Sequence, residues 1–153
     1  MSAYVIGDIN VTDPDTFAKY AGLVPASSGA FGGRYLGRGP DECEPCEGDW
    51  NPKRFVLAEY KDVGSIKSWY YSDEYKELTK LRQSASTGTL LVAEGVEPPE
   101  QGRDSGKPGY LVADIDVTDA DTFEKYRVGV PATIAAYGGK YLIRGAQGEV
   151  LEG

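Results

Sequence analysis

Three charged side chains have the types and positions to act on a small polar molecule: Asp8, Arg38 and Glu59. A carboxylate and a guanidinium that face a half-buried cavity can bind a polar ligand or move a proton. We therefore predict these three as candidate catalytic residues. The alternative is that Asp8 and Arg38 form a structural ion pair that satisfies a buried charge, and that Glu59 lies at a strand edge in solvent.

Three large aromatic side chains could form the wall of such a cavity: Tyr35, Trp50 and Trp69. Ligand pockets are lined mainly by apolar and aromatic groups, with a few polar groups that orient the ligand. We therefore predict Tyr35, Trp50 and Trp69 as candidate ligand-binding residues. Each of them could instead be an ordinary residue of the hydrophobic core.

The sequence of 153 residues contains no histidine, which limits the chemistry available. A Ser-His-Asp or Cys-His catalytic system is excluded within one chain, and so are His-ligated zinc, haem and non-haem iron. Any proton transfer must use carboxylates, tyrosine, lysine or water. The glycine patterns of nucleotide-binding loops are also absent, so we predict no cofactor.

Two cysteines, Cys43 and Cys46, form a C-x-x-C pair in the acidic stretch ECEPCE. Such a pair can be half of a zinc site or a redox couple, but zinc needs four ligands. The neighbouring carboxylates raise the pKa of a thiol and disfavour the reactive thiolate. We predict an acidic loop with free thiols and no metal site, and a four-cysteine zinc site between two copies is the alternative.

The elements that would position these residues follow from periodicity and turn signals. Residues 4–11 predict a strand, and Thr-Asp-Pro at residues 12–14 is typical of a helix start. Pro25 predicts a kink or a restart in that helix, and the glycine pair at residues 32–33 predicts a left-handed cap. We also predict strands over 34–39, 54–60 and 89–94 and a helical region over 65–86 that is broken near Ser72.

This order of elements predicts an α+β fold, a ferredoxin-like βαββαβ sandwich with both helical regions on one face of an antiparallel sheet. Alternation in the first strand places Asp8 on the face away from the helices. In this topology the third strand lies next to the first and the second. We therefore expect Glu59 and either Arg34 or Arg38 to lie near Asp8.

A long internal duplication divides the chain. Residues 4–39 align with residues 110–145 without a gap, and 21 of the 36 aligned positions are identical. We predict a complete domain over 1–97, a linker rich in Pro, Gly and charge over 98–109, and the first half (βαβ) of a second copy over 110–153. The candidate residues Asp8 and Arg38 recur as Asp114 and Arg144, whereas the two cysteines do not recur.

The second copy stops at Gly153, before the counterparts of a third strand, a second helix and a fourth strand. A βαβ unit of this size buries too little surface to fold well alone. Three explanations stay open: the natural protein is longer, the half-copy packs on the first domain or on its twin in a dimer, or a partner completes it. The mass of the native protein would separate the first explanation from the others.

The first copy resembles the domain of unknown function 1330 family of the dimeric α/β-barrel superfamily. The resemblance rests on AYVIGDINVTDPDTFAKY, VPASSGAFGGRYLGRG, EGDWNPKRFVLAEY and WYYSDEYKELTKLRQSAS, and covers about residues 2–97. The second copy matches as far as VPATIAAYGGKYLIRG and the closing EVLEG. The helices of the predicted fold leave one apolar sheet face uncovered, so we expect a homodimer, or pairing between the repeats, that covers it.

The superfamily includes cofactor-free monooxygenases, small isomerases and haem enzymes. The resemblance therefore implies a cofactor-independent small-molecule enzyme, monooxygenase-like or isomerase-like. The alternative function is a non-catalytic ligand-binding or dimerisation module. Binding of small molecules combined with an Asp8→Asn variant would separate the two functions, because a structural Asp8 would affect only assembly.

The charge balance bears on partners and location. The chain has 16 Lys and Arg against 24 Asp and Glu, a net charge of -8. An acidic surface repels phosphate backbones and anionic lipid, so we expect neither nucleic acid nor membrane as a partner. The sequence shows no apolar run of membrane-spanning length and no signal-peptide pattern, so we expect a soluble cytoplasmic protein.

Overall fold

The computed structural model describes residues 1–39, 43–96, 108–145 and 148–153. The chain divides into two compact units, Met1–Val96 with Ile143–Gly153, and Glu97–Leu142. Most of the linker predicted over 98–109, and the start of the polar loop that follows residue 39, lie outside the described residues. The two units are described separately below.

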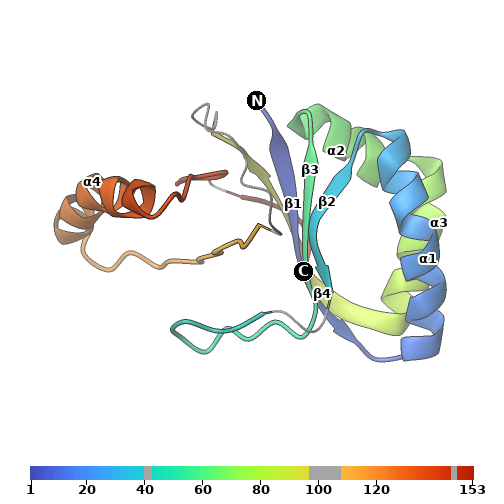
Figure 1. Cartoon of the computed structure of the whole chain (residues 1–153). Coiled ribbons are helices and arrows are strands. Elements are labelled where there is room, and N and C mark those ends of the chain that lie inside the picture. The colour runs from blue at the N-terminus through green and yellow to red at the C-terminus, as the bar shows by residue number, and fades with distance from the viewer. Residues whose placement is uncertain (40–42, 97–107, 146–147) are drawn as a thin grey trace. The chain divides into compact units, whose positions relative to one another are not determined.

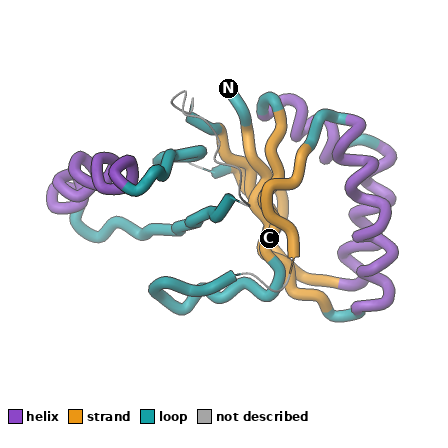
Figure 2. Tube along the Cα trace, viewed as in Figure 1, coloured by secondary structure: helices purple, strands orange, loops and turns teal. Residues whose placement is uncertain are grey.

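The first unit is built on one antiparallel sheet (Figures 1 and 2). The strand order is β2-β3-β1-β4-β5, and every neighbouring pair is antiparallel. The strands are β1 (Ala3–Val11), β2 (Arg34–Gly39), β3 (Phe55–Tyr60), β4 (Ser86–Glu94) and β5 (Glu149–Glu152). The predicted α+β class is confirmed, and β3 lies between β1 and β2 as expected.

Three helices pack on one face of this sheet: α1 (Pro14–Ala30), α2 (Val63–Tyr70) and α3 (Asp73–Ala85). Each begins at a residue whose side chain accepts a hydrogen bond from a backbone N–H of the first turn, namely Asp13, Asp62 and Ser72. Such caps satisfy donors that have no partner within the helix. The predicted break near Ser72 is therefore the boundary between α2 and α3.

Helix α1 continues through Pro25 to Ala30, so the predicted restart at Pro25 is wrong. Proline lacks an N–H and cannot bond the carbonyl of the residue four positions earlier, which is Ala21. A side chain from the sheet supplies the missing donor, as described below, and this is why the helix can continue. The helix ends as predicted, with Gly32 in the left-handed region at a φ of 79°.

The core lies between the helices and the sheet. Buried apolar residues from β1, β3 and β4 meet those of the three helices, and the Trp69 ring contacts those of Tyr60 and Tyr75. The core aromatic residues are Phe17, Tyr20, Tyr60, Trp69 and Tyr75. Leu151 of β5 also packs against this core.

Strand β5 comes from the closing segment of the second copy and pairs with the outer edge of β4. Glu152 receives two hydrogen bonds from the guanidinium of Arg82, which is 1% exposed, and others at 3.0 Å from Tyr70 Oη and Gln83 Nε2. Glu149 pairs with Lys67 at 2.8 Å. Neither this strand pairing nor the buried ion pair was predicted from the sequence.

The second unit contains helix α4 (Ala120–Ala136), whose first turn is capped by Asp119 in the same manner as α1. None of the residues of α4 is buried. Within residues 110–117 and the described part of 140–148 no strand forms, so the two strands expected for the βαβ half-copy are absent there. A strand needs hydrogen-bond partners for its backbone N–H and C=O groups. Strand β5 has them on β4.

No helix in the described ranges is long and apolar enough to cross a membrane.

Candidate ligand pocket between the helices and the sheet

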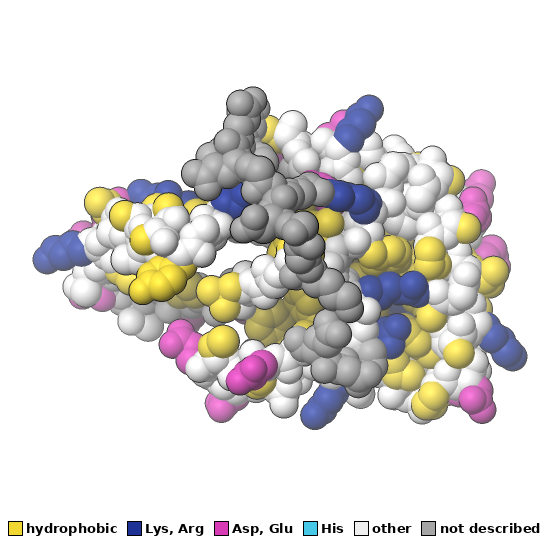
Figure 3. All heavy atoms as spheres, in the orientation of Figure 1, with side chains coloured by type: hydrophobic (Ala, Val, Ile, Leu, Met, Phe, Trp, Pro, Cys, Tyr) yellow, Lys and Arg dark blue, Asp and Glu magenta, His cyan; other side chains and the backbone are white. Residues whose placement is uncertain are grey.

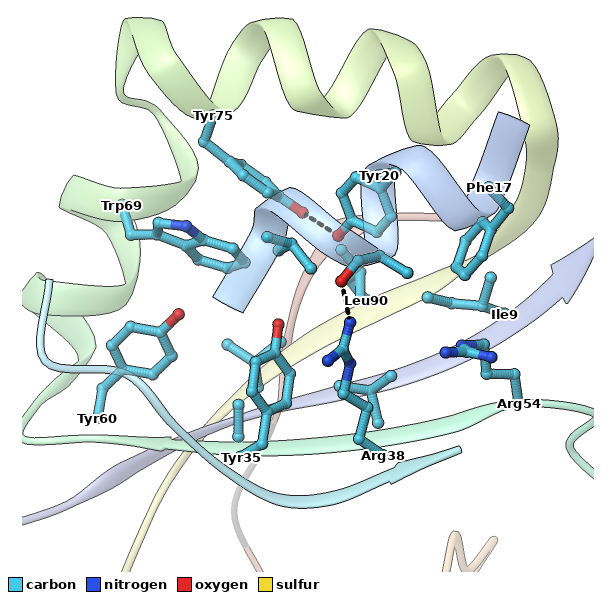
Figure 4. A pocket seen from close by; sticks show the side chains of 15 residues that line it. Ile9, Phe17, Tyr20, Tyr35, Arg38, Arg54, Tyr60, Trp69, Tyr75 and Leu90 are labelled. Atoms are coloured by element: carbon cyan, nitrogen blue, oxygen red, sulfur yellow. Dashed lines mark hydrogen bonds between the residues drawn. The ribbon is translucent and has the colours of Figure 1, made fainter. Parts of the chain in front are cut away.

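A small cavity of about 30 Å³ lies between the helices and the sheet of the first unit (Figure 4). This volume is enough for about two water molecules. Six aromatic residues and two arginines contribute to its lining: Phe17, Tyr20, Tyr35, Tyr60, Trp69, Tyr75, Arg38 and Arg54. Apolar residues of β1, β3 and β4 form its floor.

Most polar groups of the inner wall bond one another. The hydroxyls of Tyr20 and Tyr75 share a hydrogen bond of 3.0 Å, and the hydroxyl of Tyr60 lies 2.7 Å from Ser28 Oγ. Tyr35 differs, because its hydroxyl points into the cavity and has no hydrogen-bond partner among the described residues (Figure 4). A polar ligand atom is therefore the natural partner for the Tyr35 hydroxyl.

An irregularity in β2 sets which of its side chains reach the cavity. Tyr35 pairs with Ala58, but Gly37, not Leu36, pairs with Leu57. This bulge shifts the alternation by one residue, so Tyr35 and Arg38 both lie on the helix side although they are three positions apart. A regular strand would place them on opposite faces. The glycine within β2 is the sequence signal for such a bulge.

Arg38 connects the sheet to α1. Its Nη2 donates a hydrogen bond to the backbone oxygen of Ala21, the carbonyl that Pro25 leaves without a helical partner. Its guanidinium carbon also lies 5.0 Å from the centre of the Tyr35 ring. These two contacts fix the guanidinium at the side of the cavity that is open between β2 and α1.

Arg54 approaches the same opening from the residue before β3. Its guanidinium carbon lies 4.9 Å from the centre of the Phe17 ring, and its backbone oxygen accepts a bond of 2.9 Å from Ile9 N. Figure 3 shows basic side chains among hydrophobic ones on the surface between β2 and α1. None of the described residues that line the cavity is acidic, and two of them, Arg38 and Arg54, are basic.

The tyrosine hydroxyls of the cavity stay protonated at neutral pH. Burial raises the pKa of Tyr35 to about 12, against the opposing effect of the Arg38 and Arg54 charges. Burial also raises the pKa of Tyr20 and Tyr60 well above their ordinary value. These hydroxyls are therefore hydrogen-bond donors and acceptors at neutral pH, and Tyr35 is a poor general base.

The structure does not bring Asp8, Arg38 and Glu59 together. Asp8 and Glu59 lie on the face of the sheet away from the helices, whereas the bulge turns Arg38 to the helix side. Asp8 pairs in register with Phe55 and Glu59 with Tyr4, so the two carboxylates are four residues, or about 13 Å, apart along the sheet.

Each of these carboxylates has its own partners. Trp50 Nε1 donates to Asp8 Oδ2 at 2.8 Å, and Glu59 accepts from Tyr4 Oη at 3.2 Å and pairs with Arg34. Burial alone would raise the pKa of Glu59, but Arg34 outweighs it and holds that pKa below its ordinary value. Among the predicted ligand-binding residues, Tyr35 and Trp69 line the cavity, whereas Trp50 lies on the other face with Asp8.

Three lining residues were not predicted from the sequence as members of a site: Arg54, Tyr20 and Tyr75. The two tyrosines were visible as members of apolar helical stripes, which is also the pattern of an ordinary core. Arg54 stands at the start of a strand, where a charged residue is unremarkable. The Arg54 side chain reaches the cavity because this end of β3 faces α1.

Cys43 and Cys46 are exposed and form no disulfide. Among the residues that the structure describes, no three Cys, Asp or Glu side chains gather in a way that could hold a metal ion.

The fold and the cavity define the class of molecule: a small α+β domain with an aromatic pocket under its helices. A family model described as a domain of unknown function (DUF1330) matches residues 2–96 and 108–153, and the chain belongs to this family. The two matched ranges agree with one full copy and a second, partial copy. Among curated proteins no sequence matches.

One solved structure of similar fold is described as a protein of unknown function. The crystal structure of RPA0582, a protein of unknown function from Rhodopseudomonas palustris, superposes with a TM-score of 0.52 at 19% identity, covering 63% of this chain and 84% of that one. The methylated RPA0582 protein gives a TM-score of 0.46 at 19% identity, covering 67% and 84%. At this identity the likeness concerns the fold alone.

Proposed function

We propose that this chain is a small-molecule-binding domain whose ligand occupies the cavity between α1 and the sheet. The observation that carries the proposal is the combination of an aromatic lining with a Tyr35 hydroxyl that points into the cavity without a partner in the described structure. Ligand sites are typically apolar pockets with a few polar groups aimed into them.

Entry of a ligand requires side chains to move, because the cavity now holds only about 30 Å³. Tyr35 is half-buried, so its ring can shift and widen the cavity without disturbing the core, while Arg38 keeps its bond to the Ala21 oxygen. The Tyr35 ring lies at the opening between β2 and α1. Its displacement gives an aromatic ligand access to the rings behind.

This geometry favours binding over the cofactor-independent monooxygenase or isomerase activity. Those reactions need a group that removes a proton, and the described lining offers neither carboxylate nor histidine. Asp8 and Glu59, the predicted acid–base candidates, lie on the opposite face of the sheet. An enzyme that used this cavity would depend on tyrosine hydroxyls or on a group of the ligand itself.

Filling the cavity tests the proposal. Ala21 lines it, whereas Ala18 is exposed on the same helix, so Ala21→Leu and Ala18→Leu form a matched pair. We expect indole, benzamide or benzoate to bind the wild type and Ala18→Leu at millimolar concentration in ligand-observed NMR, and Ala21→Leu to lose this binding. Circular dichroism is the control that both variants are folded. Equal binding to both variants, or no binding to the wild type, would contradict the proposal.

A second proposed property is homodimerisation through the sheet face away from the helices. The partly exposed apolar residues Ile6, Phe55 and Leu91 alternate onto that face, and a second copy is the occupant we propose for it. Sedimentation velocity of the wild type and of Ile6→Glu tests this. We expect a dimer for the wild type and a monomer for the variant, and a wild-type monomer at micromolar concentration would overturn it.

A further inference from the structure

Two guanidinium groups stand at the same opening of the cavity. Arg38 pairs in register with Val56, and Arg54 precedes Val56 by two residues on the same face. Such diagonal neighbours in an antiparallel pair have Cα atoms about 7–8 Å apart. Long side chains at this spacing can converge on one small group, and guanidinium groups bind carboxylates through paired N–H donors.

The surroundings favour an anion at this point. No acidic residue is among the described residues that line the cavity, and Arg38 forms no ion pair within the described ranges. An anion placed between two guanidinium groups can accept hydrogen bonds from both. Behind the two arginines, the rings of Tyr20, Tyr35 and Trp69 line the cavity and offer apolar surface to a flat group.

Helix α1 holds Arg38 in place for this role. Because Pro25 has no N–H, the Ala21 oxygen remains available and receives Arg38 Nη2. A guanidinium has five N–H donors, so the bond to Ala21 leaves others for a ligand. Pro25 is thus a positioning residue that acts through a backbone carbonyl.

We infer that the ligand of this pocket is a small aromatic carboxylate, whose carboxylate binds Arg38 and Arg54 and whose ring enters the aromatic cavity. The inference rests on the proposed function and names the substrate class of the same site. The Tyr35 hydroxyl, which points into the cavity, then donates to a polar atom of the ligand.

Benzoate and benzamide are probes that separate the charge from the shape, because they are nearly isosteric and only benzoate is anionic. Isothermal titration calorimetry of the wild type should show benzoate binding about tenfold more tightly than benzamide. Equal affinities would overturn the inference and leave the proposed function intact. Failure of both probes to bind would contradict the proposed function itself.

Arginine variants identify the groups responsible. Arg38→Gln and Arg54→Gln should each abolish most of the preference for benzoate and leave benzamide binding unchanged. Arg34→Gln is the matched control, since Arg34 lies on the same strand but pairs with Glu59 on the opposite face. A benzoate preference that survives in both Arg38→Gln and Arg54→Gln would refute the inference. Arg38 is exposed, so its variant retains the fold even where Arg54→Gln does not.

Pro25→Ala tests the positioning of Arg38. Alanine restores an N–H that competes for the Ala21 oxygen, so the benzoate preference should fall by about threefold while benzamide binding stays constant. Pro131→Ala in α4 makes the same change outside the pocket and should alter neither affinity. An unchanged preference in Pro25→Ala would show that Arg38 does not depend on this carbonyl.

Discussion

Tyr35 and Tyr60 line the same cavity but have different bonding. The Tyr60 hydroxyl lies 2.7 Å from Ser28 Oγ in the core, whereas the Tyr35 hydroxyl has no partner among the described residues. Removing the partner of a buried hydroxyl lowers the stability of the folded protein, because that hydroxyl is left unpaired. Removing a hydroxyl that has no partner leaves no other group unpaired. The difference separates a residue that holds the fold from one that is available to a ligand.

We therefore predict that Tyr60→Phe lowers the free energy of unfolding by about 1.5 kcal/mol, because it leaves the buried Ser28 hydroxyl unpaired. Tyr35→Phe should change it by less than about 0.5 kcal/mol. Urea denaturation followed by tryptophan fluorescence measures both. A larger cost for Tyr35→Phe than for Tyr60→Phe would show that the Tyr35 hydroxyl has a structural role.

Sequence reasoning placed some of the candidate residues and misplaced others. Tyr35 and Trp69 line the cavity, and their predicted ligand binding stays a prediction. Either Arg34 or Arg38 was predicted near Asp8 from the order of the strands, but the bulge at Leu36 turns Arg38 to the helix side. A bulge depends on pairing with β3, a long-range contact that a single strand's pattern does not contain.

At the scale of elements, the pairing of β5 with β4 depends on one buried ion pair. Arg82 is buried with its guanidinium on Glu152, and Lys67 pairs with Glu149 at the exposed end of the same strand. Removing one partner of a buried pair is far more costly than removing one of an exposed pair. The two glutamates of β5 thus form an internal comparison.

We predict that Glu152→Ala lowers the free energy of unfolding of the first unit by about 3 kcal/mol, since it leaves the Arg82 charge buried without a partner. Glu149→Ala should cost less than about 1 kcal/mol. Chemical denaturation of the full chain measures both. Equal effects of the two substitutions would mean that β5 is not held by Arg82.

The same pair predicts a dependence on pH. Burial alone would raise the pKa of Glu152, but the bonds and charge of Arg82 outweigh it and hold the pKa below its ordinary value of 4.5. A lowered folded-state pKa stabilises the protein above pH 4.5, and this contribution disappears as the pH falls through the lowered value. The stability difference between wild type and Glu152→Gln should therefore be full at pH 7 and shrink below pH 4.5. A difference that grows on acidification would contradict the assignment.

The elements were predicted well where the signals are local and poorly where they are not. The caps Asp13 and Ser72 and the glycine at residue 32 act within one turn of the chain, and all three appear as expected. Strand β5 was missed because its formation depends on the edge of β4. The segments EPCEG at 44–48 and EVLEG at 149–153 share a spacing of glutamates and glycine, yet only the second is a strand.

At the scale of the whole molecule, the two copies differ in what surrounds their first helix. α1 buries Phe17, Tyr20 and Val24 against the sheet, and the corresponding helix α4 buries none of its residues. An isolated helix of this length is marginal in water, because most helical stability comes from packing. The same sequence pattern therefore has a different stability in each copy.

Hydrogen exchange followed by mass spectrometry tests this contrast. Amides of α1 should exchange only through rare opening of the packed first unit, and those of α4 should exchange at least a hundredfold faster, within seconds at neutral pH. Peptides from residues 14–30 and 120–136 provide the comparison in one sample. Comparable protection of the two helices would show that α4 packs against a partner in solution.

Pro25 and Arg38 have a consequence for how relatives of this domain should vary. The proline leaves the Ala21 oxygen of α1 without a helical donor, and Arg38 of β2 donates to that oxygen instead. This bond orients the guanidinium. Loss of either makes the other less useful, so the two positions should co-vary among homologues, present together or replaced together. The duplicated segment retains both, as Pro131 and Arg144, although α4 buries nothing. Homologues that keep both residues are therefore expected to keep a guanidinium at this opening.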